Sequence, residues 1–344
     1  MAAMIDWITA RVPCTLPGYI NGGAVVFIDA AGRVERSTDR RLQVRGSHES
    51  MLAVRGGGGE LEISGNPAKW LQGHNTFGSS HPIKLVYYLM RRLVPLLRLT
   101  PTLDDRRAWL YGDYDLLRVD VTRMYDLGSN AEVVRFLSGA AVVAKGRYQK
   151  ASAYGSDTVY IGQKSSRVTV KFYNKLQEMT TRGHLLPDTL SSEDRAKLLE
   201  FVEGQLRYEL TLRSKELAER GLRSASAWSS STADRLLDER LEKIELNDAL
   251  RLAEDVIDQL PPKLVPIYDA WRAGRDLKQL YAKNTFYRYR RQLLPYQIDI
   301  AEVRPREVIS QTQYLMGGRS LKSFLVGPGV PPPDWAKGTE LLVG

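Results

Sequence analysis

The amino-acid sequence predicts an α+β fold, in which helices pack on one face of a central, mainly antiparallel sheet and a C-terminal helical domain follows. Two observations carry this prediction. Several segments alternate strictly between apolar and polar residues, which is typical of strands with one buried face. Apolar residues at helical spacing occupy regions between these segments. With 344 residues, of which 43% are hydrophobic, the chain is long enough to form two domains.

The strands are expected at residues 5–12, 61–64, 115–122, 157–163, 166–175 and 205–213, and the main helices at residues 80–95 and 129–145. Pro95 bends or ends the first of these helices. The four-glycine run at residues 56–59 is not followed by Gly-Lys-Ser/Thr, so we expect a turn there rather than a phosphate-binding loop.

A short helix is expected between the second strand and the first long helix. Asn66 is a good N-cap, Pro67 suits the first helical position, and Gly73 can adopt the left-handed conformation that ends a helix. This arrangement would hold His74 just past the helix end, where an imidazole can reach a metal or a phosphate. The alternative is a loop histidine without a ligand.

Alternation within the strands predicts which side chains share a face. In residues 115–122 we expect Leu117, Val119 and Val121 to point into the core. The outward positions of the strands carry acids, a tyrosine and cations: Asp120, Glu209, Tyr173, Lys171, Lys175, Arg118, Arg207 and Arg213. With His74 and Glu62, this set would suit a divalent-metal site beside a tyrosine. The alternative is a solvated sheet face whose opposite charges stabilise strand pairing by about 0.2–1 kcal/mol per pair.

Charge and composition restrict the class of partner. There are 49 Lys and Arg residues against 40 Asp and Glu, a formal net charge of +9, which favours a polyanionic partner. The single cysteine, Cys14, excludes an internal disulfide framework and a cysteine-rich zinc site. No run approaches the roughly 18 apolar residues of a membrane span, and the N-terminus lacks a signal-peptide core. We therefore expect no membrane association, and a protein that stays where it is made.

Four blocks give the chain a more specific identity. NPAKWLQGHNTFG, RVDVT, VKFYNK and LRYELTLRSKELAERGL occur in this order within the N-terminal two thirds of the chain. Together they resemble the gene II protein family, the replication initiators of filamentous phages. The resemblance implies a rolling-circle initiator nuclease fold and a site-specific endonuclease that nicks the viral strand at the phage origin. A tyrosine would attack the phosphate, stay joined to the 5′ end and later rejoin the product strand.

The resemblance places the nucleophile on Tyr173, with Tyr160 as the reserve. Because a phenol has a pKa of about 10, nearby positive charge from Lys171 and Lys175 would favour the phenolate. A divalent ion could stabilise the charge that builds on the phosphate. We expect Mg²⁺ or Mn²⁺, held by His74, Asp120, Glu209 and Glu62, with Glu178 in reserve.

The chain departs from better-known rolling-circle initiators, which carry two histidines on either side of one hydrophobic residue. The four histidines, His48, His74, His81 and His184, never form that pattern. The resemblance further implies origin DNA, duplex and single-stranded, and a host helicase and polymerase as partners in the host cell cytoplasm. Two rival functions remain: an origin-binding regulator that does not nick, and a metal-dependent nuclease that activates water.

The expected domains are a nicking domain (1–223), a linker (224–231), a helical DNA-binding domain (232–325) and an extended tail (326–344) anchored by Trp335. Within the helical domain, residues 232–260 are expected to form a charged amphipathic helix with a break near Asn247. Residues 276–294 have the pattern of a helix-turn-helix, with Thr285 as the N-cap of the second helix. Its candidate DNA-binding residues are Thr285, Tyr287, Arg288, Arg290 and Arg291. In the nicking domain, the candidate DNA-binding residues are Arg118, Arg207 and Arg213. The alternative is an ordinary helical hairpin with a basic face.

Overall fold

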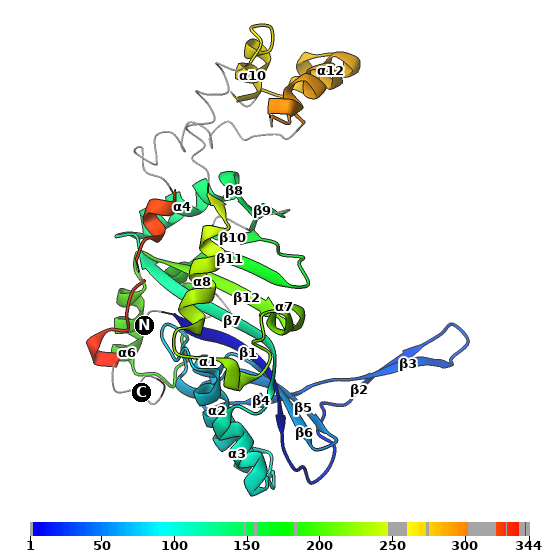
Figure 1. The fold of residues 1–344 in the computed structure, drawn as a ribbon, viewed down its shortest axis with the longest axis vertical. Helices are drawn as coiled ribbons and strands as arrows, with labels where there is room; N and C mark the ends of the chain where they lie inside the picture. Colours follow the sequence, from blue (N-terminus) through cyan, green and yellow to red (C-terminus); the bar gives the residue numbers. More distant parts are fainter. Residues whose placement is uncertain are drawn as a thin grey trace.

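An antiparallel sheet organises the protein, which we describe from a computed structural model (Figure 1). The described residues are 3–146, 149–154, 157–181, 185–246, 260–272, 275–296, 298–301, 321–327, 329–336 and 341. The larger of two sheets has the strand order β13-β8-β9-β10-β11-β12-β7-β1-β6-β5-β4, and every neighbouring pair is antiparallel. The predicted antiparallel sheet is confirmed.

The strand bounds in the large sheet are β1 (Met4–Pro13), β4 (Leu42–Arg45), β5 (Met51–Gly57), β6 (Glu60–Gly65), β7 (Asp115–Asp126), β8 (Ala144–Gly146), β9 (Gln149–Tyr154), β10 (Thr158–Ile161), β11 (Val168–Asn174), β12 (Gln205–Arg213) and β13 (Glu245–Leu246). The helices near it are α1 (Pro67–Gln72), α2 (Pro82–Leu96), α3 (Leu103–Tyr111), α4 (Asn130–Val143), α5 (Lys175–Thr180), α6 (Ser192–Phe201), α7 (Ser214–Glu219) and α8 (Thr232–Glu242).

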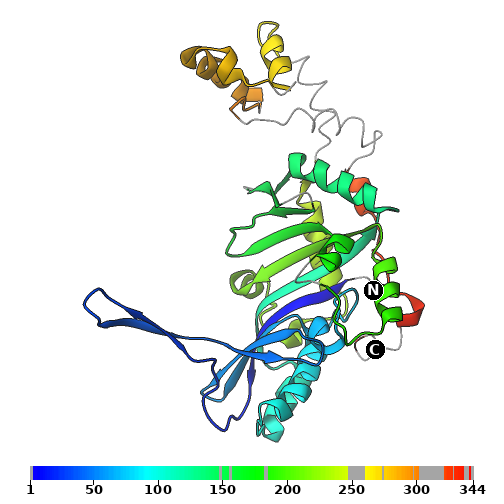
Figure 2. The same cartoon turned by 180° about the vertical axis from the view of Figure 1, so that it is seen from behind.

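Long helices cover the apolar face of this sheet. Phe136 of α4 packs edge-on against Phe172 of β11, with ring centroids 5.6 Å apart. The hydroxyl of Tyr208 on β12 donates a hydrogen bond to the backbone carbonyl of Leu237 on α8 (3.1 Å). Figure 1 views the sheet from the side of α8, and Figure 2 views the opposite side. That opposite side is the polar face, and α5, α6 and the loop before α2 pack near one end of it.

The alternation in β7 is interrupted, which corrects one expectation. The register between β1 and β7 shifts between Thr9 and Ala10, so that Ala10 pairs with Leu116 rather than Leu117. Leu116 is fully buried, whereas Leu117 is half-buried. Beyond the shift, Val119 and Val121 lie in the core as predicted. A bulge inserts one residue and so reverses the faces on one side of it.

The predicted linker is part of the sheet domain. Residues 225–227 form a short 3₁₀ helix, η1 (Ala225–Ala227), and Trp228 is buried. Helix α8, which we assigned to the C-terminal domain, buries Leu236 and Leu237 in the main core. Leu321 and Leu325 of η3 (Leu321–Leu325) belong to the same core. The expected boundaries at 224 and 232 are therefore wrong, because these apolar side chains pack under the sheet. Asn247 lies outside the described residues.

A second, smaller core lies near the C-terminus. It is built by α10 (Val265–Arg272), α11 (Leu277–Leu280), α12 (Lys283–Leu293) and η2 (Leu294–Tyr296). Trp271, Phe286 and Leu293 are among its buried residues. Asp276 caps α11, which lies at the start of the predicted helix-turn-helix segment. Thr285 is not the N-cap of the next helix, because α12 begins two residues earlier and its N-cap position is Ala282.

Two peripheral features complete the fold. The strands β2 (Ala24–Ile28) and β3 (Val34–Asp39) form a separate two-stranded sheet that projects from the body (Figures 1 and 2). This hairpin is not among the strands expected from the sequence. Near the C-terminus, Trp335 of η4 (Asp334–Ala336) packs edge-on against Phe77, with ring centroids 5.6 Å apart; its role as the anchor of the tail stays a prediction.

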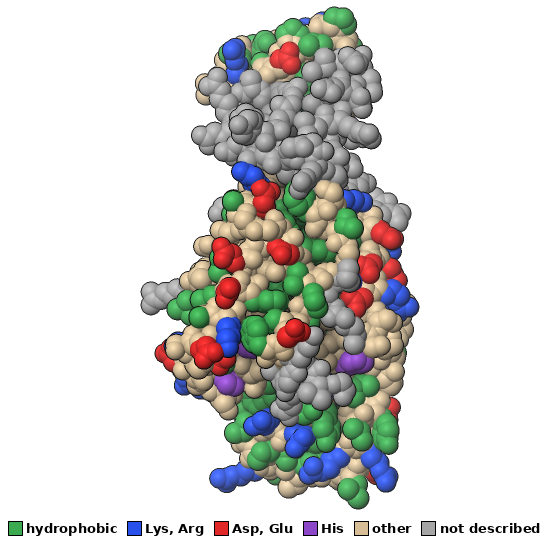
Figure 3. Space-filling model, turned by 90° about the vertical axis from the view of Figure 1, so that its left-hand side faces the viewer, with side chains coloured by type: hydrophobic (Ala, Val, Ile, Leu, Met, Phe, Trp, Pro, Cys, Tyr) green, Lys and Arg blue, Asp and Glu red, His purple; other side chains and the backbone are tan. Residues whose placement is uncertain are grey.

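Charge is unevenly distributed over the molecule. On the side shown in Figure 3, acidic side chains gather over the middle of the body, and Lys and Arg side chains gather toward the end opposite the C-terminal helices. Exposed acids on and after α6 include Glu193, Asp194, Glu200 and Glu203. Among the described residues, no helix combines the length and the apolar character needed to cross a membrane.

Candidate active site

Tyr173 lies on the polar face of the sheet, near the end of β11. Its partner across the strand pair is Arg207 of β12, and the side-chain nitrogen of Lys171 lies 3.8 Å from its ring centroid. The side chain is 3% exposed, and burial raises the pKa of the phenol well above 10, while the charge of Arg207 acts in the opposite direction. The residue therefore combines a buried phenol with two neighbouring cations. It does not point into the apolar core.

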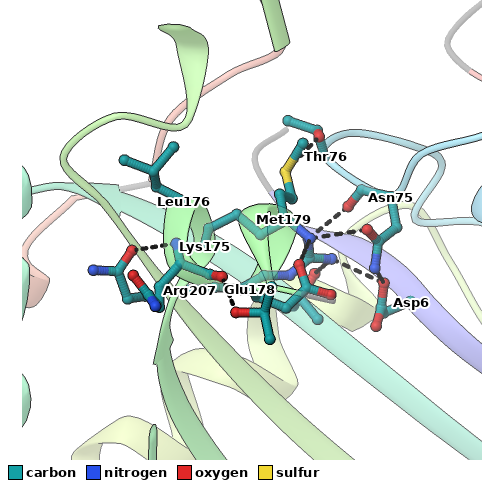
Figure 4. A network of polar contacts seen from close by, with 12 residues as sticks. Asp6, Asn75, Thr76, Lys175, Leu176, Glu178, Met179 and Arg207 are labelled. Atoms are coloured by element: carbon teal, nitrogen blue, oxygen red, sulfur yellow. Dashed lines mark hydrogen bonds and ion pairs between the residues drawn. The ribbon is translucent and has the colours of Figure 1, made fainter. Parts of the chain in front are cut away.

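Arg207 is fully buried and holds three segments together (Figure 4). Its guanidinium donates hydrogen bonds to Asp6 Oδ1 (3.0 Å), to Thr122 Oγ1 (2.9 Å) and to the backbone carbonyl of Asn75 (2.5 Å). A guanidinium enclosed in this way does not face solvent, where the DNA backbone would lie. The predicted DNA-binding role of Arg207 is therefore wrong, because its donors are directed at groups inside the protein.

Lys175 is the second fully buried cation in Figure 4. Its ammonium donates to Asn75 Oδ1 (2.8 Å) and Glu178 Oε2 (2.7 Å). Burial lowers the pKa of Lys175 to about 8, although the nearby Glu178 carboxylate acts to raise it. Burial also acts to raise the pKa of Glu178, but Lys175 outweighs it and holds that pKa at about 2. The reserve ligand Glu178 is thus ionised and paired with a lysine.

The segment that carries His74 folds as predicted. Asn66 accepts a hydrogen bond from the backbone N–H of Lys69 and so caps α1, Pro67 begins the helix, and Gly73 ends it with a φ of 84°. A side chain at Gly73 would meet the His48 ring at 3.1 Å, which adds a steric reason for glycine. The side-chain amides of Asn66 and Asn75 both donate to Asp6 Oδ1, at 2.9 and 2.8 Å.

Asp6 is the residue that sequence reasoning missed. It is buried on β1 at a register shift and accepts from Arg207 and from two asparagines. The available signal was a carboxylate within an otherwise apolar strand pattern. Buried carboxylates are rare unless paired, so Asp6 could have been flagged, although its partners could not.

His74 lies away from the predicted metal ligands Asp120 and Glu209. Its ring packs against Phe77, with centroids 4.6 Å apart, and Gln72 is a neighbour at 3.5 Å. Burial, assisted by the charges of Lys175 and His48, lowers the pKa of His74 to about 3. The imidazole is therefore neutral at pH 7, and the charges that act on it come from Lys175, His48 and Asp194 rather than from Asp120 and Glu209.

Asp120 and Glu209 lie on adjacent strands of the polar face. Arg118 binds Asp120 through two hydrogen bonds of 2.9 and 2.6 Å, and burial nevertheless raises the pKa of Asp120. Glu209 is opposite Lys171 in the register. Burial raises the pKa of Glu209 to about 7; Lys171 opposes this shift, whereas Asp120 and Asp6 reinforce it. Glu209 can therefore gain or lose a proton near neutral pH.

The predicted metal ligands do not form one site. In the described part of the chain, no three His, Cys, Asp or Glu side chains converge as a metal ion requires. Glu62 is instead surrounded by arginines and forms ion pairs with Arg11, Arg41 and Arg55. Since arginines already neutralise Asp120 and Glu62, this ligand set does not fit a divalent ion, and we derive no chemical step through one.

The remaining polar-face residues lie farther along the strands. Arg213 pairs with Arg118 in the register and donates to Thr169 Oγ1 (2.9 Å). The reserve nucleophile Tyr160 is half-buried on β10, opposite Lys171, whose ammonium lies 5.9 Å from its ring. Arg118 also lies over the ring of Trp7, at 5.3 Å. The sheet thus brings the tyrosines and the candidate cations to the same face.

The candidate DNA-binding residues of α12 differ in their availability. Tyr287, Arg288 and Arg291 are exposed. Arg290 instead makes a two-pronged ion pair with Asp299, with both distances 2.7 Å. Thr285 is half-buried within the helix. The exposed basic surface of α12 is therefore smaller than the sequence pattern predicts.

Comparison with known proteins assigns the chain to a family. The family model for the N-terminal part of the replication-associated gene II protein matches residues 4–231. The chain belongs to this family. The replication-associated gene II protein of Enterobacteria phage I2-2 is 33% identical over 307 residues, which cover 87% of this chain and 88% of the relative. A solved rolling circle replication initiator protein from Geobacillus stearothermophilus matches with 15% identity and a TM-score of 0.29, covering 70% of this chain and 85% of that one.

The family match contains every residue of the candidate active site. Tyr173, Arg207 and Lys175 all lie within residues 4–231. The C-terminal core of α10, α11 and α12 lies beyond the matched range. The relative from phage I2-2 extends over most of the chain.

Proposed function

We propose that the protein is a site-specific, single-strand DNA endonuclease that nicks the viral-strand origin of a filamentous phage and so starts rolling-circle replication. Membership of the gene II protein family and the name of the relative from phage I2-2 support replication as the process. The observation that carries the chemistry is Tyr173, a phenol on a polar sheet face with Arg207 and Lys171 beside it.

The proposed reaction is a transesterification at phosphorus. The phenolic oxygen of Tyr173 attacks the phosphate, forms a bond to phosphorus and loses its proton. The bond from phosphorus to the 3′ oxygen breaks, and that oxygen takes up a proton. The products are a 5′-phosphotyrosine and a free 3′ hydroxyl, from which a polymerase can extend. Because the phosphodiester energy is kept in the phosphotyrosine, the reverse attack by a 3′ hydroxyl rejoins the strand.

Positive charge is what a buried phenol needs in order to react. Burial alone keeps Tyr173 protonated, and the charge of Arg207 lowers the free energy of the phenolate relative to an uncharged site. Lys171 lies against the same ring. Lys175 acts at longer range by holding Asn75 and Glu178 in place. We assign Glu209, diagonal to Tyr173 across the strand pair, to the proton transfer, because its pKa is about 7.

Further parts of the proposal concern partners. Arg213, which is half-buried on the polar face, is the candidate for contact with the DNA backbone there, together with Tyr287, Arg288 and Arg291 of α12. Arg118 stays a predicted DNA contact, although two of its nitrogens already bind Asp120. A requirement for Mg²⁺ or Mn²⁺ stays a prediction without an assigned ligand set. A host helicase, a host polymerase and action in the host cytoplasm also stay predictions.

The nucleophile is tested with two tyrosine variants. Tyr173→Phe is expected to bind a single-stranded origin oligonucleotide as the unaltered protein does, but to lose both nicking and the covalent adduct. Tyr160→Phe is the matched control, since this tyrosine is half-buried on the neighbouring strand, and it should retain both. Gel assays of nicking and mass spectrometry of the adduct supply the measurements.

Three outcomes would count against the proposal. Nicking by Tyr173→Phe would show that another group attacks. Nicking by the unaltered protein without any adduct would indicate a hydrolytic nuclease. Origin binding without nicking would indicate a regulator.

A further inference from the structure

The hairpin formed by β2 and β3, which we call the arm (residues 24–39), stands apart from the other described elements. Every residue of its two strands is exposed. Its exposed large apolar side chains are Val25, Val26, Phe27, Ile28 and Val34. Contacts within the arm are few: Arg36 covers the Phe27 ring at 4.1 Å, and Arg33 pairs with Asp29 at the turn (2.8 Å). An isolated two-stranded hairpin is marginally stable in water, so such an arm calls for a partner.

The two strands of the arm differ in charge, and this difference restricts the class of partner that the arm can bind. The strand β2 reads AVVFI and has no charged residue, whereas β3 reads VERSTD and carries Glu35, Arg36 and Asp39. Among the described strands, β2 pairs with β3 alone, so its other edge has backbone groups available for pairing. Natural proteins protect exposed edges with charges, prolines or bulges. The free edge of β2 has no charge and no proline, and the irregularity in the hairpin leaves the extra residue, Glu35, on β3. This is expected of an edge that pairs with another strand.

DNA is a poor fit for this edge. Between Ala24 and Asp39 the arm has two arginines, Arg33 and Arg36, against three carboxylates, those of Asp29, Glu35 and Asp39. One of the arginines is already paired with Asp29. Groove-binding ribbons need a net positive charge, because phosphate contacts dominate their affinity. A net negative arm with an apolar edge instead favours contact with protein.

We propose that β2 pairs antiparallel with β2 of a second copy of this chain, around a two-fold axis at Val26. Such pairing places Val25 opposite Phe27 of the partner subunit and Ala24 opposite Ile28 of the partner subunit. Every cross-strand pair is then apolar, and both free edges gain hydrogen bonds. A two-fold interface requires a surface that is complementary to itself. Two antiparallel copies of β2 meet this requirement, because no pair of opposite residues brings like charges together. The two arms together form a four-stranded sheet.

The interface is small, which sets the expected affinity. Each arm contributes five strand residues to the pairing, fewer than the roughly 20–30 residues per side of a standard stable interface. We therefore expect a dissociation constant of about 1 to 100 μM for the free protein. Two copies bound to one DNA molecule would associate more strongly, because their local concentration is higher. This inference does not depend on the nicking chemistry.

Sedimentation velocity of the full chain, between about 1 and 100 μM, tests the pairing. The unaltered protein is expected to shift from monomer to dimer as its concentration rises. Val26→Lys would place two ammonium groups against each other at the axis, and should stay monomeric. Ser37→Lys is the matched control, because Ser37 is the cross-strand partner of Val26 but lies on β3. This variant should dimerise like the unaltered protein.

A cross-link provides a second readout. Directly opposite residues of antiparallel strands lie within disulfide reach, so Val26→Cys should give a covalent dimer on mild oxidation. The natural cysteine, Cys14, is buried and should give little background. Val34→Cys on β3 should not cross-link. A monomer at every concentration, or a Val26→Lys variant that dimerises normally, would overturn the proposal. If Val26→Lys alters DNA affinity but not the oligomeric state, DNA is the partner and the proposal is wrong.

Discussion

At the scale of single residues, the protonation state of each ionisable group in the site depends on whether burial or a neighbouring charge has the larger effect on its pKa. Burial dominates at Tyr173, Lys175 and His74, and it keeps the phenol protonated and the imidazole neutral at pH 7. At Glu178 the lysine charge prevails, so the carboxylate stays ionised. Glu209 falls between these cases, with a pKa of about 7. Glu209 is therefore a carboxyl group that can change its charge near neutral pH beside Tyr173.

This balance predicts the pH dependence of nicking. Because the pKa of Glu209 is raised from 4.5 to about 7, its proton-accepting form increases from about pH 6 to pH 8 and is nearly complete above that. The nicking rate should rise over this interval until about pH 8, where Lys175, whose pKa is about 8, begins to lose the charge that holds Asn75 and Glu178. Glu209→Gln should remove the rise and lower the rate at pH 8 by roughly 10²-fold. Initial rates on a single-stranded origin substrate, measured from pH 5.5 to 9, provide the profile.

Glu178→Gln is the control for this profile. The pKa of Glu178 is about 2, so Glu178 itself does not titrate in this range. Its loss should lower the pKa of Lys175, which the carboxylate raises, but the rise assigned to Glu209 should keep its midpoint near pH 7. A Glu209→Gln variant that kept the pH 7 midpoint would show that another group titrates there.

Arg207 should matter for stability. Its removal leaves Asp6, with a side chain only 12% exposed, without its cation, and leaves the Asn75 carbonyl and Thr122 without this donor. Arg207→Met is expected to lower the free energy of unfolding by about 3–5 kcal/mol, since an unpaired buried charge remains. Arg207→Lys keeps the charge but loses the planar fork, and should cost about 1–2 kcal/mol. Urea denaturation measures both; a loss under about 1 kcal/mol for Arg207→Met would contradict the role assigned to Arg207.

At the scale of elements, the sequence predicts strands well where one face is buried. Strands β7, β11 and β12 were found from alternation because their apolar residues face a helix-covered core. The arm lacks this signal, because both of its faces are exposed and the five apolar residues of β2 do not alternate with polar ones. The bulge near Leu117 was also missed, since the extra residue depends on pairing with β1.

Helix α8 shows the limit of reasoning from composition. The serine-rich segment before it looks like a linker, but its tryptophan, Trp228, is buried. The helix is fixed to the sheet partly through Arg123 of β7, which forms ion pairs with Asp234 and Asp238. The predicted amphipathic helix is confirmed for Thr232–Glu242, whereas Glu245–Leu246 form a strand and residues 247–259 lie outside the described part of the chain. The local sequence does not show which surface the apolar side of this helix packs against.

The candidate site was predicted in part. The cap, helix and glycine stop around His74 are local features, so the sequence was sufficient for them. Which charged groups meet depends on contacts between residues at least 100 positions apart, as in the bonds from Lys175 and Arg207 to Asn75. Alternation placed Arg207 on the polar face, but it could not reveal that Asp6 and Asn75 enclose it there.

At the scale of the whole molecule, chemistry and DNA recognition are assigned to different cores. The candidate nucleophile lies on the sheet, within the family match, while α12 belongs to the second core, beyond the match. Acidic side chains on the side shown in Figure 3 make the region around α6 unfavourable for DNA. We therefore expect affinity for the duplex origin to depend on α12 and the chemical step to depend on the polar face of the sheet.

Two arginine substitutions test this division. Arg288→Ala with Arg291→Ala removes exposed charges of α12, whereas Arg290 is held by Asp299 and is left intact. If both arginines contact phosphates, duplex origin binding should weaken at least about tenfold at roughly 0.1 M salt, and the slope of log affinity against log salt should fall by about 2. Nicking of a saturating single-stranded origin oligonucleotide should keep its maximal rate, because Tyr173 and its neighbours are unchanged.

The control removes the same charge from another exposed surface. Arg235→Ala with Lys243→Ala acts on and just after α8, which packs on the apolar side of the sheet, and should leave the salt slope unchanged. Equal weakening by both double variants would mean that the net charge of the chain, rather than α12, sets the affinity. A lower maximal nicking rate in the α12 variant would instead mean that the two cores act together in the chemical step.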